Sequence, residues 1–135
     1  MTVGMRIQDG LESTILSYLD RGVGQILVPN LLTKAQAEEL VKWTYFAPMG
    51  LRSATSHTAM YSQFDGDHIR QYQYINENTL LCAQLESIVA LENLDEIAQV
   101  PGLDCLILGA NDLYAALGFP YQNEHPKVVE ATDRI

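Results

Sequence analysis

Four short strand-like runs, separated by stretches with the spacing of amphipathic helices, constrain the fold of this chain more than any other feature. The runs lie at residues 2–7, 25–29, 80–85 and 103–108. Apolar strands that alternate with helices pair in parallel through right-handed crossovers. The sequence therefore predicts an α/β protein with a parallel sheet.

Helix signals occupy the stretches between these runs. Asp9 with Glu12, and Thr33 with Gln36, have the spacing of capping boxes, in which two side chains bond each other's backbone amides at a helix start. Asp67 is expected to begin a third helix. The helices are expected near residues 11–19, 34–44, 68–78 and 94–98 and from residue 126 onwards, with a short helical turn at 113–117.

The glycine pattern separates two kinds of parallel fold. A Rossmann unit requires a glycine-rich turn directly after its first strand, whereas Gly22 and Gly24 lie between a helix and a strand, so we exclude that fold. A complete (β/α)8 barrel has about 250 residues. Four strands in 135 residues would form about half of one, and the pattern alone does not decide between a barrel and an open sheet.

Composition excludes several classes of partner. The formal net charge is −9, and binding to nucleic acid phosphates requires clustered Lys and Arg instead. No apolar run approaches the ~20 residues that span a membrane. The first residues lack the pattern of a signal peptide, so the cytoplasm is the expected location. Cys82 and Cys105 lie in strand-like runs, where buried, reduced thiols are favoured over a disulfide or a metal pair.

Polar side chains lie at the carboxyl end of the third run, the end at which parallel α/β folds place their functional groups. Gln84 and Glu86 are two residues apart, so their side chains are expected to face the barrel interior together. A buried carboxylate is costly without a neutralising partner, for which a metal ion is a natural candidate. In the alternative interpretation, Glu86 caps the next helix or meets solvent.

A second carboxylate follows the fourth run. Asp112 follows the turn at Gly109, and it either lies beside Glu86 at the carboxyl ends of the strands or caps a short helix. Two carboxylates from neighbouring strand ends suit Mg²⁺ or Mn²⁺. Arg6, near the end of the first run, is expected to bind a carboxylate or to form a surface salt bridge. Asn30 is expected only to shape the loop after the second run.

The histidines and serines do not indicate nucleophilic catalysis. His57, His68 and His125 follow none of the four runs, so surface positions are expected for all three. The G-x-S-x-G motif is absent, and the serines do not occupy strand-to-helix elbows. A Ser-His-Asp triad therefore has no support.

Six short motifs stand out along the chain. They are ILVPN at 26–30, YFAPMGLR at 45–52, QLE at 84–86, NLDEI at 93–97, VPGLD at 100–104 and GANDL at 109–113. In their order and spacing they resemble the middle of the barrel of the HpcH/HpaI aldolase family, the class II pyruvate aldolases related to the citrate lyase β subunits. The resemblance covers nearly the whole chain and implies one incomplete barrel domain over residues 1–135.

The resemblance assigns roles to individual residues. Glu86 and Asp112 resemble the family's two metal ligands, for Mg²⁺ or Mn²⁺. Gln84 resembles the glutamine beside the bound 2-oxo acid, and Arg6 the arginine that contacts pyruvate and its enolate oxygen. The backbone around Asn111 and Asp112 is expected to hold the pyruvate carboxylate.

The implied activity is metal-dependent, reversible cleavage of a 4-hydroxy-2-oxo acid to pyruvate and an aldehyde, in a homo-oligomer. Ala110 replaces the usual proline, and Ser53 the usual glycine. The family's histidine base and its aspartate partner have no counterpart here, so the 135-residue chain alone is expected to be weak or inactive. The alternatives are a non-catalytic half-barrel that binds metal and 2-oxo acid or associates with a homologue, a degenerate chain with only a structural use, and a citrate-lyase-like CoA-ester lyase.

Overall fold

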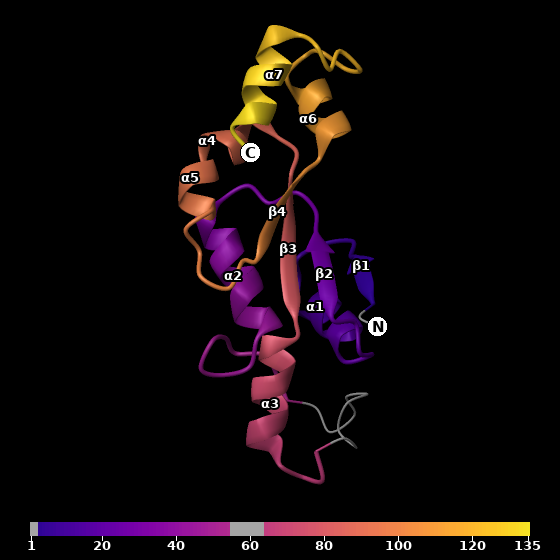
Figure 1. The fold of residues 1–135 in the computed structure, drawn as a ribbon, viewed down its shortest axis with the longest axis vertical. Coiled ribbons are helices and arrows are strands. Elements are labelled where there is room, and N and C mark those ends of the chain that lie inside the picture. Colours follow the sequence, from indigo (N-terminus) through magenta and orange to yellow (C-terminus); the bar gives the residue numbers. More distant parts are fainter. Residues whose placement is uncertain (1–2, 55–63) are drawn as a thin grey trace.

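A parallel sheet of four strands forms the centre of the protein. The computed structural model describes residues 3–54 and 64–135. The strands lie in the order β1-β2-β3-β4, and each neighbouring pair is parallel (Figure 1). Their bounds are β1 (Gly4–Arg6), β2 (Gln25–Val28), β3 (Leu80–Leu85) and β4 (Cys105–Leu108). The predicted α/β class, the parallel pairing and all four runs are confirmed.

The helices follow the expected order with two differences. A short helix over residues 88–92, which was not predicted, precedes the expected helix near residue 94, and the expected turn at 113–117 is a helix that begins earlier and includes Asn111 and Asp112. The bounds are α1 (Glu12–Leu19), α2 (Lys34–Thr44), α3 (His68–Glu77), α4 (Ile88–Glu92), α5 (Leu94–Ile97), α6 (Ala110–Ala116) and α7 (Pro126–Asp133).

Side chains cap the helices at two of the three expected places. Thr33 and Gln36 form the predicted capping box of α2, and Asp67 accepts a hydrogen bond from a backbone amide in the first turn of α3. The prediction for α1 was wrong, because its N-cap residue is Leu11. Asp9 instead accepts a hydrogen bond from the Leu11 amide at 3.1 Å, in the turn before the helix.

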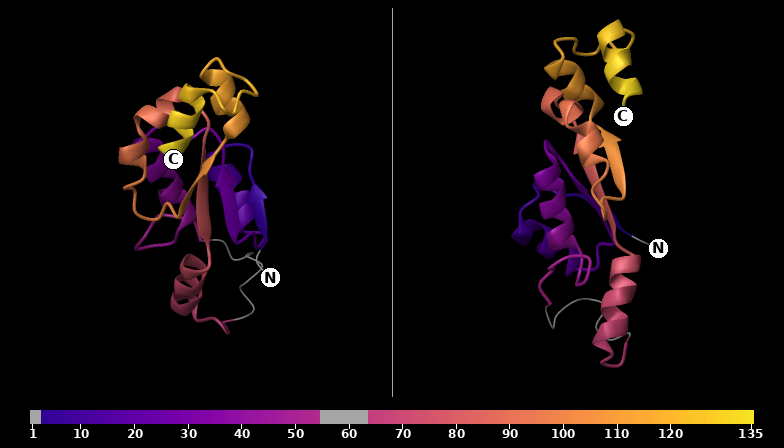
Figure 2. Two further views of the ribbon diagram at one scale, coloured as in Figure 1. Left: turned by 45° about the horizontal axis from the view of Figure 1, so that its top comes forward. Right: turned by 90° about the vertical axis from the view of Figure 1, so that its left-hand side faces the viewer.

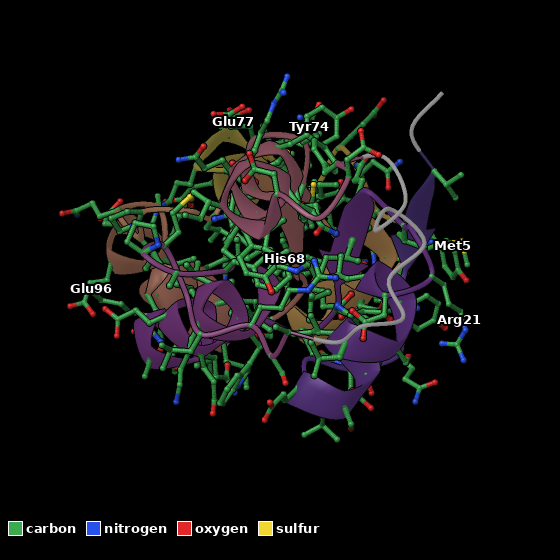
Figure 3. The ribbon with its side chains drawn as sticks, turned by 90° about the horizontal axis from the view of Figure 1, so that it is seen from below. Met5, Arg21, His68, Tyr74, Glu77 and Glu96 are labelled. Atoms are coloured by element: carbon green, nitrogen blue, oxygen red, sulfur yellow. The ribbon has the colours of Figure 1, made fainter. Side chains whose placement is uncertain are left out.

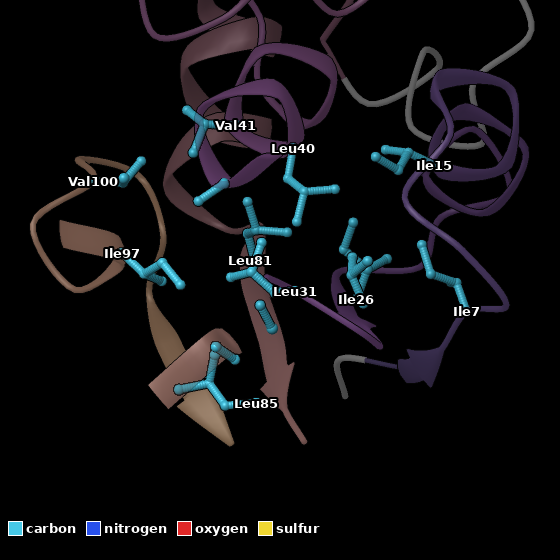
Figure 4. Close-up of a cluster of buried hydrophobic side chains, with 14 of the residues drawn as sticks. Ile7, Ile15, Ile26, Leu31, Leu40, Val41, Leu81, Leu85, Ile97 and Val100 are labelled. Atoms are coloured by element: carbon cyan, nitrogen blue, oxygen red, sulfur yellow. The ribbon is translucent and has the colours of Figure 1, made fainter. Parts of the chain in front are cut away.

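The hydrophobic core lies on one face of the sheet, beneath the helices that cover it (Figure 2). Leu81, Ala83 and Leu85 point from β3 into this core and are fully buried. Figure 4 shows the cluster between the strands and helices α1 and α2. Its labelled members are Ile7, Ile15, Ile26, Leu31, Leu40, Val41, Leu81, Leu85, Ile97 and Val100.

The opposite face of the sheet would line the interior of a barrel. Cys82 and Gln84 alternate with the core residues of β3 and therefore lie on this face. Cys82 is buried, but Cys105 is exposed on the edge strand β4, so the expectation of a buried thiol was wrong there. Both thiols are free, as predicted. We call this side the open face, because no helix of residues 3–54 or 64–135 covers it.

A smaller cluster lies beyond the carboxyl end of β4, at the top of Figure 1. It joins helices α4, α6 and α7 through apolar side chains. None of the helices in the described ranges is long and apolar enough to cross a membrane. The members of the cluster are Leu91, Leu113, Tyr114, Val128 and Ala131.

Candidate functional site

The carboxyl end of β3 brings together two of the predicted site residues from different strands. Arg6 Nε donates a hydrogen bond to Gln84 Oε1 at 3.2 Å. Leu27 of β2 is the register partner of both Arg6 and Cys82, so the guanidinium reaches across β2 to a residue two positions further along β3. A salt bridge of Arg6, the alternative expectation, is not among the two found in the described residues.

Glu86 follows β3 and is enclosed by protein. Its side chain is only 6% exposed. Oε1 accepts a hydrogen bond from the Asn30 backbone amide at 2.9 Å, whereas Oε2 is buried without any hydrogen-bond partner. Ser87, rather than Glu86, caps α4 by accepting from the Ala90 amide. Burial and the Ser87 cap therefore exclude both alternative roles, helix capping and a solvent-facing carboxylate.

Gly109, the residue after β4, allows this carboxylate and the neighbouring amide to approach the backbone. A Cβ atom at this position would lie 2.6 Å from Glu86 Cβ and 2.7 Å from both Glu86 Oε2 and Gln84 Nε2. The Gly109 amide also donates to the Leu85 carbonyl at 2.8 Å. Only glycine fits here without displacing the two side chains.

The loop after β2 supplies a contact that the sequence did not reveal. Asn30 has a positive φ of 57°, a conformation that asparagine adopts more readily than most residues. This conformation accompanies the bond from its amide to Glu86. The next amide, that of Leu31, donates to the Gln84 carbonyl at 3.2 Å. A Pro-Asn pair at a strand end was the one available signal, and it indicated only a turn.

The second predicted carboxylate lies on the helix that follows Gly109. Asp112 and Asn111 are exposed in the first turn of α6. Gly109 is the N-cap residue of that helix, and it provides no side-chain cap. Asp112 thus lies three residues beyond Gly109, and no hydrogen bond or ion pair recorded among the described residues joins its side chain to Glu86, Gln84 or Arg6.

The buried carboxylate of Glu86 lacks a partner that a bound cation would supply. A buried carboxylate oxygen without a donor bears an uncompensated desolvation cost, which a bound cation would offset. A hard divalent ion is often held by one or two carboxylates, with water and substrate oxygens completing the shell. The described part of the chain contains no cluster of three or more His, Cys, Asp or Glu side chains that could hold a metal ion, so an ion at Glu86 would need further ligands from water or substrate.

The histidines that the structure describes lie away from Glu86. His68 begins α3 at the opposite end of the strands, where Figure 3 shows it from below. His125 caps α7 and stacks on Phe119, with ring centroids 3.6 Å apart. His57 falls outside the described residues. Neither described histidine is placed to act as a base beside Gln84.

Comparisons with known proteins give the family. The model of the HpcH/HpaI aldolase/citrate lyase family matches residues 2–135. The chain is 37% identical over 125 residues to 2-keto-3-deoxy-L-rhamnonate aldolase of Salmonella gallinarum, which corresponds to 92% of this chain and 46% of the relative. The chain therefore spans about half the length of the curated relatives it matches.

Solved structures give the same result for the fold. An HpcH/HpaI aldolase from Desulfitobacterium hafniense superposes with a TM-score of 0.88 at 28% identity, over 99% of this chain and 51% of that one. The citrate synthase SbnG superposes with a TM-score of 0.84 at 28% identity, over 97% and 49%. The predicted partial barrel is thus confirmed. The chain belongs to the HpcH/HpaI aldolase/citrate lyase family.

Proposed function

We propose that this chain provides the pyruvate-binding half of a carbon–carbon lyase, a metal-dependent aldolase that cleaves a 4-hydroxy-2-oxo acid to pyruvate and an aldehyde. The observation that carries the proposal is the unpartnered, buried Oε2 of Glu86 beside Gln84 and Gly109. The similarity to an aldolase over 92% of this chain supports the reaction class.

Arg6 and Gln84 are the proposed substrate-binding and catalytic groups. Their hydrogen bond holds the guanidinium on the open face, above the carboxyl end of β3. A fixed positive charge there would attract the carboxylate of a 2-oxo acid and stabilise negative charge that develops on its keto oxygen. The Gln84 amide would orient both the Arg6 guanidinium and the bound 2-oxo acid. The first-turn amides around Asn111 and Asp112 would hold the other end of the acid.

The proposed metal ligands are Glu86 and Asp112, with Mg²⁺ or Mn²⁺ as the ion. When bound, such an ion supplies Lewis-acid stabilisation of the charge that develops as the C–C bond breaks. The Asn30 amide fixes Glu86 Oε1, which leaves Oε2 available as a ligand atom. Asp112, exposed on α6, would complete the pair from the neighbouring strand end.

The 135-residue chain alone is proposed to be weak or inactive. Aldol cleavage needs a base for the hydroxyl proton, and neither described histidine lies near Gln84. The cytoplasmic location and a homo-oligomeric state remain predictions, as does the aldehyde partner. A CoA-ester lyase is the competing activity, and cleavage of an acyl-CoA rather than a free hydroxy-oxo acid would select it.

Mn²⁺ titration tests the site without requiring turnover. The wild-type chain should bind about one Mn²⁺, observed by electron paramagnetic resonance, and pyruvate should tighten that binding. Glu86→Ala should weaken Mn²⁺ binding at least tenfold, and Asp112→Asn to a smaller extent. Glu38→Ala, in an exposed i,i+4 salt bridge on α2, is the matched control and should change nothing.

The outcomes of the titration and of turnover assays separate the alternatives. Equal Mn²⁺ binding by wild type and Glu86→Ala would refute the metal site. Metal-dependent pyruvate binding without turnover would favour the non-catalytic binder. Binding of neither Mn²⁺ nor pyruvate would leave a chain with only a structural use.

A further inference from the structure

The two cysteines, Cys82 and Cys105, are direct neighbours across the sheet. They are register partners in the parallel pair of β3 and β4. Register partners in parallel strands project from the same face of a sheet, here the open face. Cys82 is buried and Cys105 is exposed, so the pair is reached from the Cys105 side.

Each thiol also has a contact of its own, and that of Cys105 is with the Leu106 carbonyl at 3.7 Å. Gln25 Nε2 contacts Cys82 Sγ at 3.6 Å, from the strand on the other side. Burial raises the pKa of the Cys82 thiol, the Gln25 contact opposes that shift, and the adjacent Cys105 adds to it. Gln25 and Cys105 therefore flank Cys82 on its two sides.

The spacing of the strands allows one ion to bridge the two sulfurs. Neighbouring strands lie about 4.8 Å apart, and the two cysteines are register partners on the same face. Their thiols therefore lie within reach of one ion that forms two bonds to sulfur, each about 2.3 Å long.

We propose that Cys82 and Cys105 form a two-thiol site for a soft, thiol-seeking ion, such as trivalent arsenic or monovalent copper. Soft ions prefer thiolate ligands, and two thiolates satisfy ions of low coordination number. The site lies one layer below the Arg6–Gln84 pair on the same face, since Gln84 is two residues beyond Cys82. It does not depend on the proposed lyase activity.

Phenylarsine oxide is a suitable probe, because its reaction with two thiols is a balanced condensation. Two S–As bonds form, the arsenic–oxygen bonds break, and both thiol protons leave with the oxygen as one water molecule. Arsenic stays trivalent and neither sulfur is oxidised, so no further reagent is needed. Intact mass spectrometry would show one phenylarsenic group per chain.

Competition with glutathione distinguishes a two-thiol site from a single reactive thiol. Wild type should retain the adduct in excess glutathione, since the second thiol acts at a high effective concentration. A dithiol competitor should remove it. Cys105→Ser, a change on the exposed strand, and Cys82→Ala, which preserves an apolar side chain, should each lose the adduct to glutathione, with at least a tenfold drop in retention.

Unfolding the protein provides an independent control. In urea, the wild-type chain should hold the arsenical at least tenfold more weakly, because the two thiols are no longer held side by side. In native buffer, the adduct should raise the unfolding temperature of wild type but not of Cys105→Ser. Loss of the wild-type adduct to glutathione, or equal retention by Cys105→Ser or by the urea-unfolded chain, would overturn the proposal.

Discussion

The two ends of the β3–β4 pair each carry an acidic residue, and the two residues differ in burial and in hydrogen bonding: Asp104 is exposed, whereas Glu86 is buried. At the amino end, Asp104 Oδ2 accepts from the Leu81 amide at 2.8 Å and from the Tyr45 hydroxyl at 2.7 Å. At the carboxyl end, Glu86 accepts one backbone amide and leaves Oε2 buried and unpaired. The same pair of strands thus ends in an exposed carboxylate that satisfies two buried donors and in a buried carboxylate with one unpaired oxygen.

This difference separates stability from function within one sheet. In parallel barrels, the carboxyl ends of the strands carry the chemistry, whereas the amino ends contribute stability. The Asp104 network ties α2 to β3 and β4 through Tyr45, which is 1% exposed. Glu86, in contrast, has one buried oxygen without a partner. Substitutions of the two acidic residues themselves should therefore differ in the size and sign of their effect on the free energy of unfolding.

The largest effect is expected for Asp104→Ala. It would leave the Leu81 amide without its acceptor and the Tyr45 hydroxyl with only the Thr79 carbonyl, at 3.5 Å, and an unpaired buried donor costs about 1–3 kcal/mol. The free energy of unfolding in urea should fall by about 2–4 kcal/mol for the two donors together. Asp104→Asn keeps a carbonyl oxygen and should lose less than half as much. Equal losses in the two variants would contradict this account of the amino end.

Gly109→Ala should have the next largest effect, now at the carboxyl end. The added Cβ would lie within 2.7 Å of Glu86 and Gln84 atoms, so those side chains or the α6 backbone must shift. Overpacking of this kind costs about 1–3 kcal/mol, measured by urea unfolding. Mn²⁺ binding should weaken in the same variant.

Gly118→Ala is a suitable control for backbone strain alone. Gly118 has a positive φ of 86°, and no atom lies within 4 Å of the place that an added Cβ would take, so Ala there meets strain but no clash. It should reduce stability without weakening Mn²⁺ binding. Full Mn²⁺ affinity in Gly109→Ala would show that the close approach of Gly109 to Glu86 and Gln84 is not needed for metal binding.

The strands and most helix starts could be predicted from the sequence because their signals are local. Apolar runs identified all four strands, and the Thr33–Gln36 pair identified the start of α2. Helix α4 was missed, because two of its five residues, Ile88 and Val89, are apolar yet 43% and 46% exposed. These two apolar residues hide, in the sequence pattern, the face of the helix that packs against the core.

The candidate site was only partly predictable, because its contacts join distant residues. The Gln84–Glu86 pair and Arg6 were identified from spacing and resemblance. The bond from Asn30 to Glu86 spans 56 residues and uses a backbone donor, which leaves no mark on side-chain composition. The position of Cys105 beside Cys82 required the register of β3 and β4, which a list of strands does not give.

Tyr45→Phe should have a smaller effect, with a characteristic pH dependence. Removal of one hydroxyl should cost about 1 kcal/mol at neutral pH. Burial, then the hydrogen bond with Asp104, raises the pKa of Tyr45 well above its ordinary value near 10. As the pH rises past about 10, the unfolded chain loses the phenol proton first, so the contribution of Tyr45 to stability falls.

Unfolding in urea at about pH 7 and about pH 11 would measure this dependence. The phenylalanine of the variant carries no such proton, so the advantage of the wild type over Tyr45→Phe should shrink between the two pH values. Other titrating groups are common to both proteins and cancel in the difference. A wild-type advantage that stays constant over this range would show that the Tyr45 hydroxyl is not protected in the folded state.

The smallest effect on stability, and the only one expected with the opposite sign, is that of Glu86→Gln. The amide keeps an oxygen for the Asn30 amide and removes the charge from a side chain whose second oxygen has no donor. The free energy of unfolding should stay the same or rise by up to about 1 kcal/mol. Added Mn²⁺ should shift this contrast in the opposite direction, because an ion at about 100 times its Kd would stabilise only the wild type, by about 2.7 kcal/mol. A destabilised Glu86→Gln in metal-free buffer would mean that the carboxylate is already compensated, and the distinction between the two ends of the sheet would then be lost.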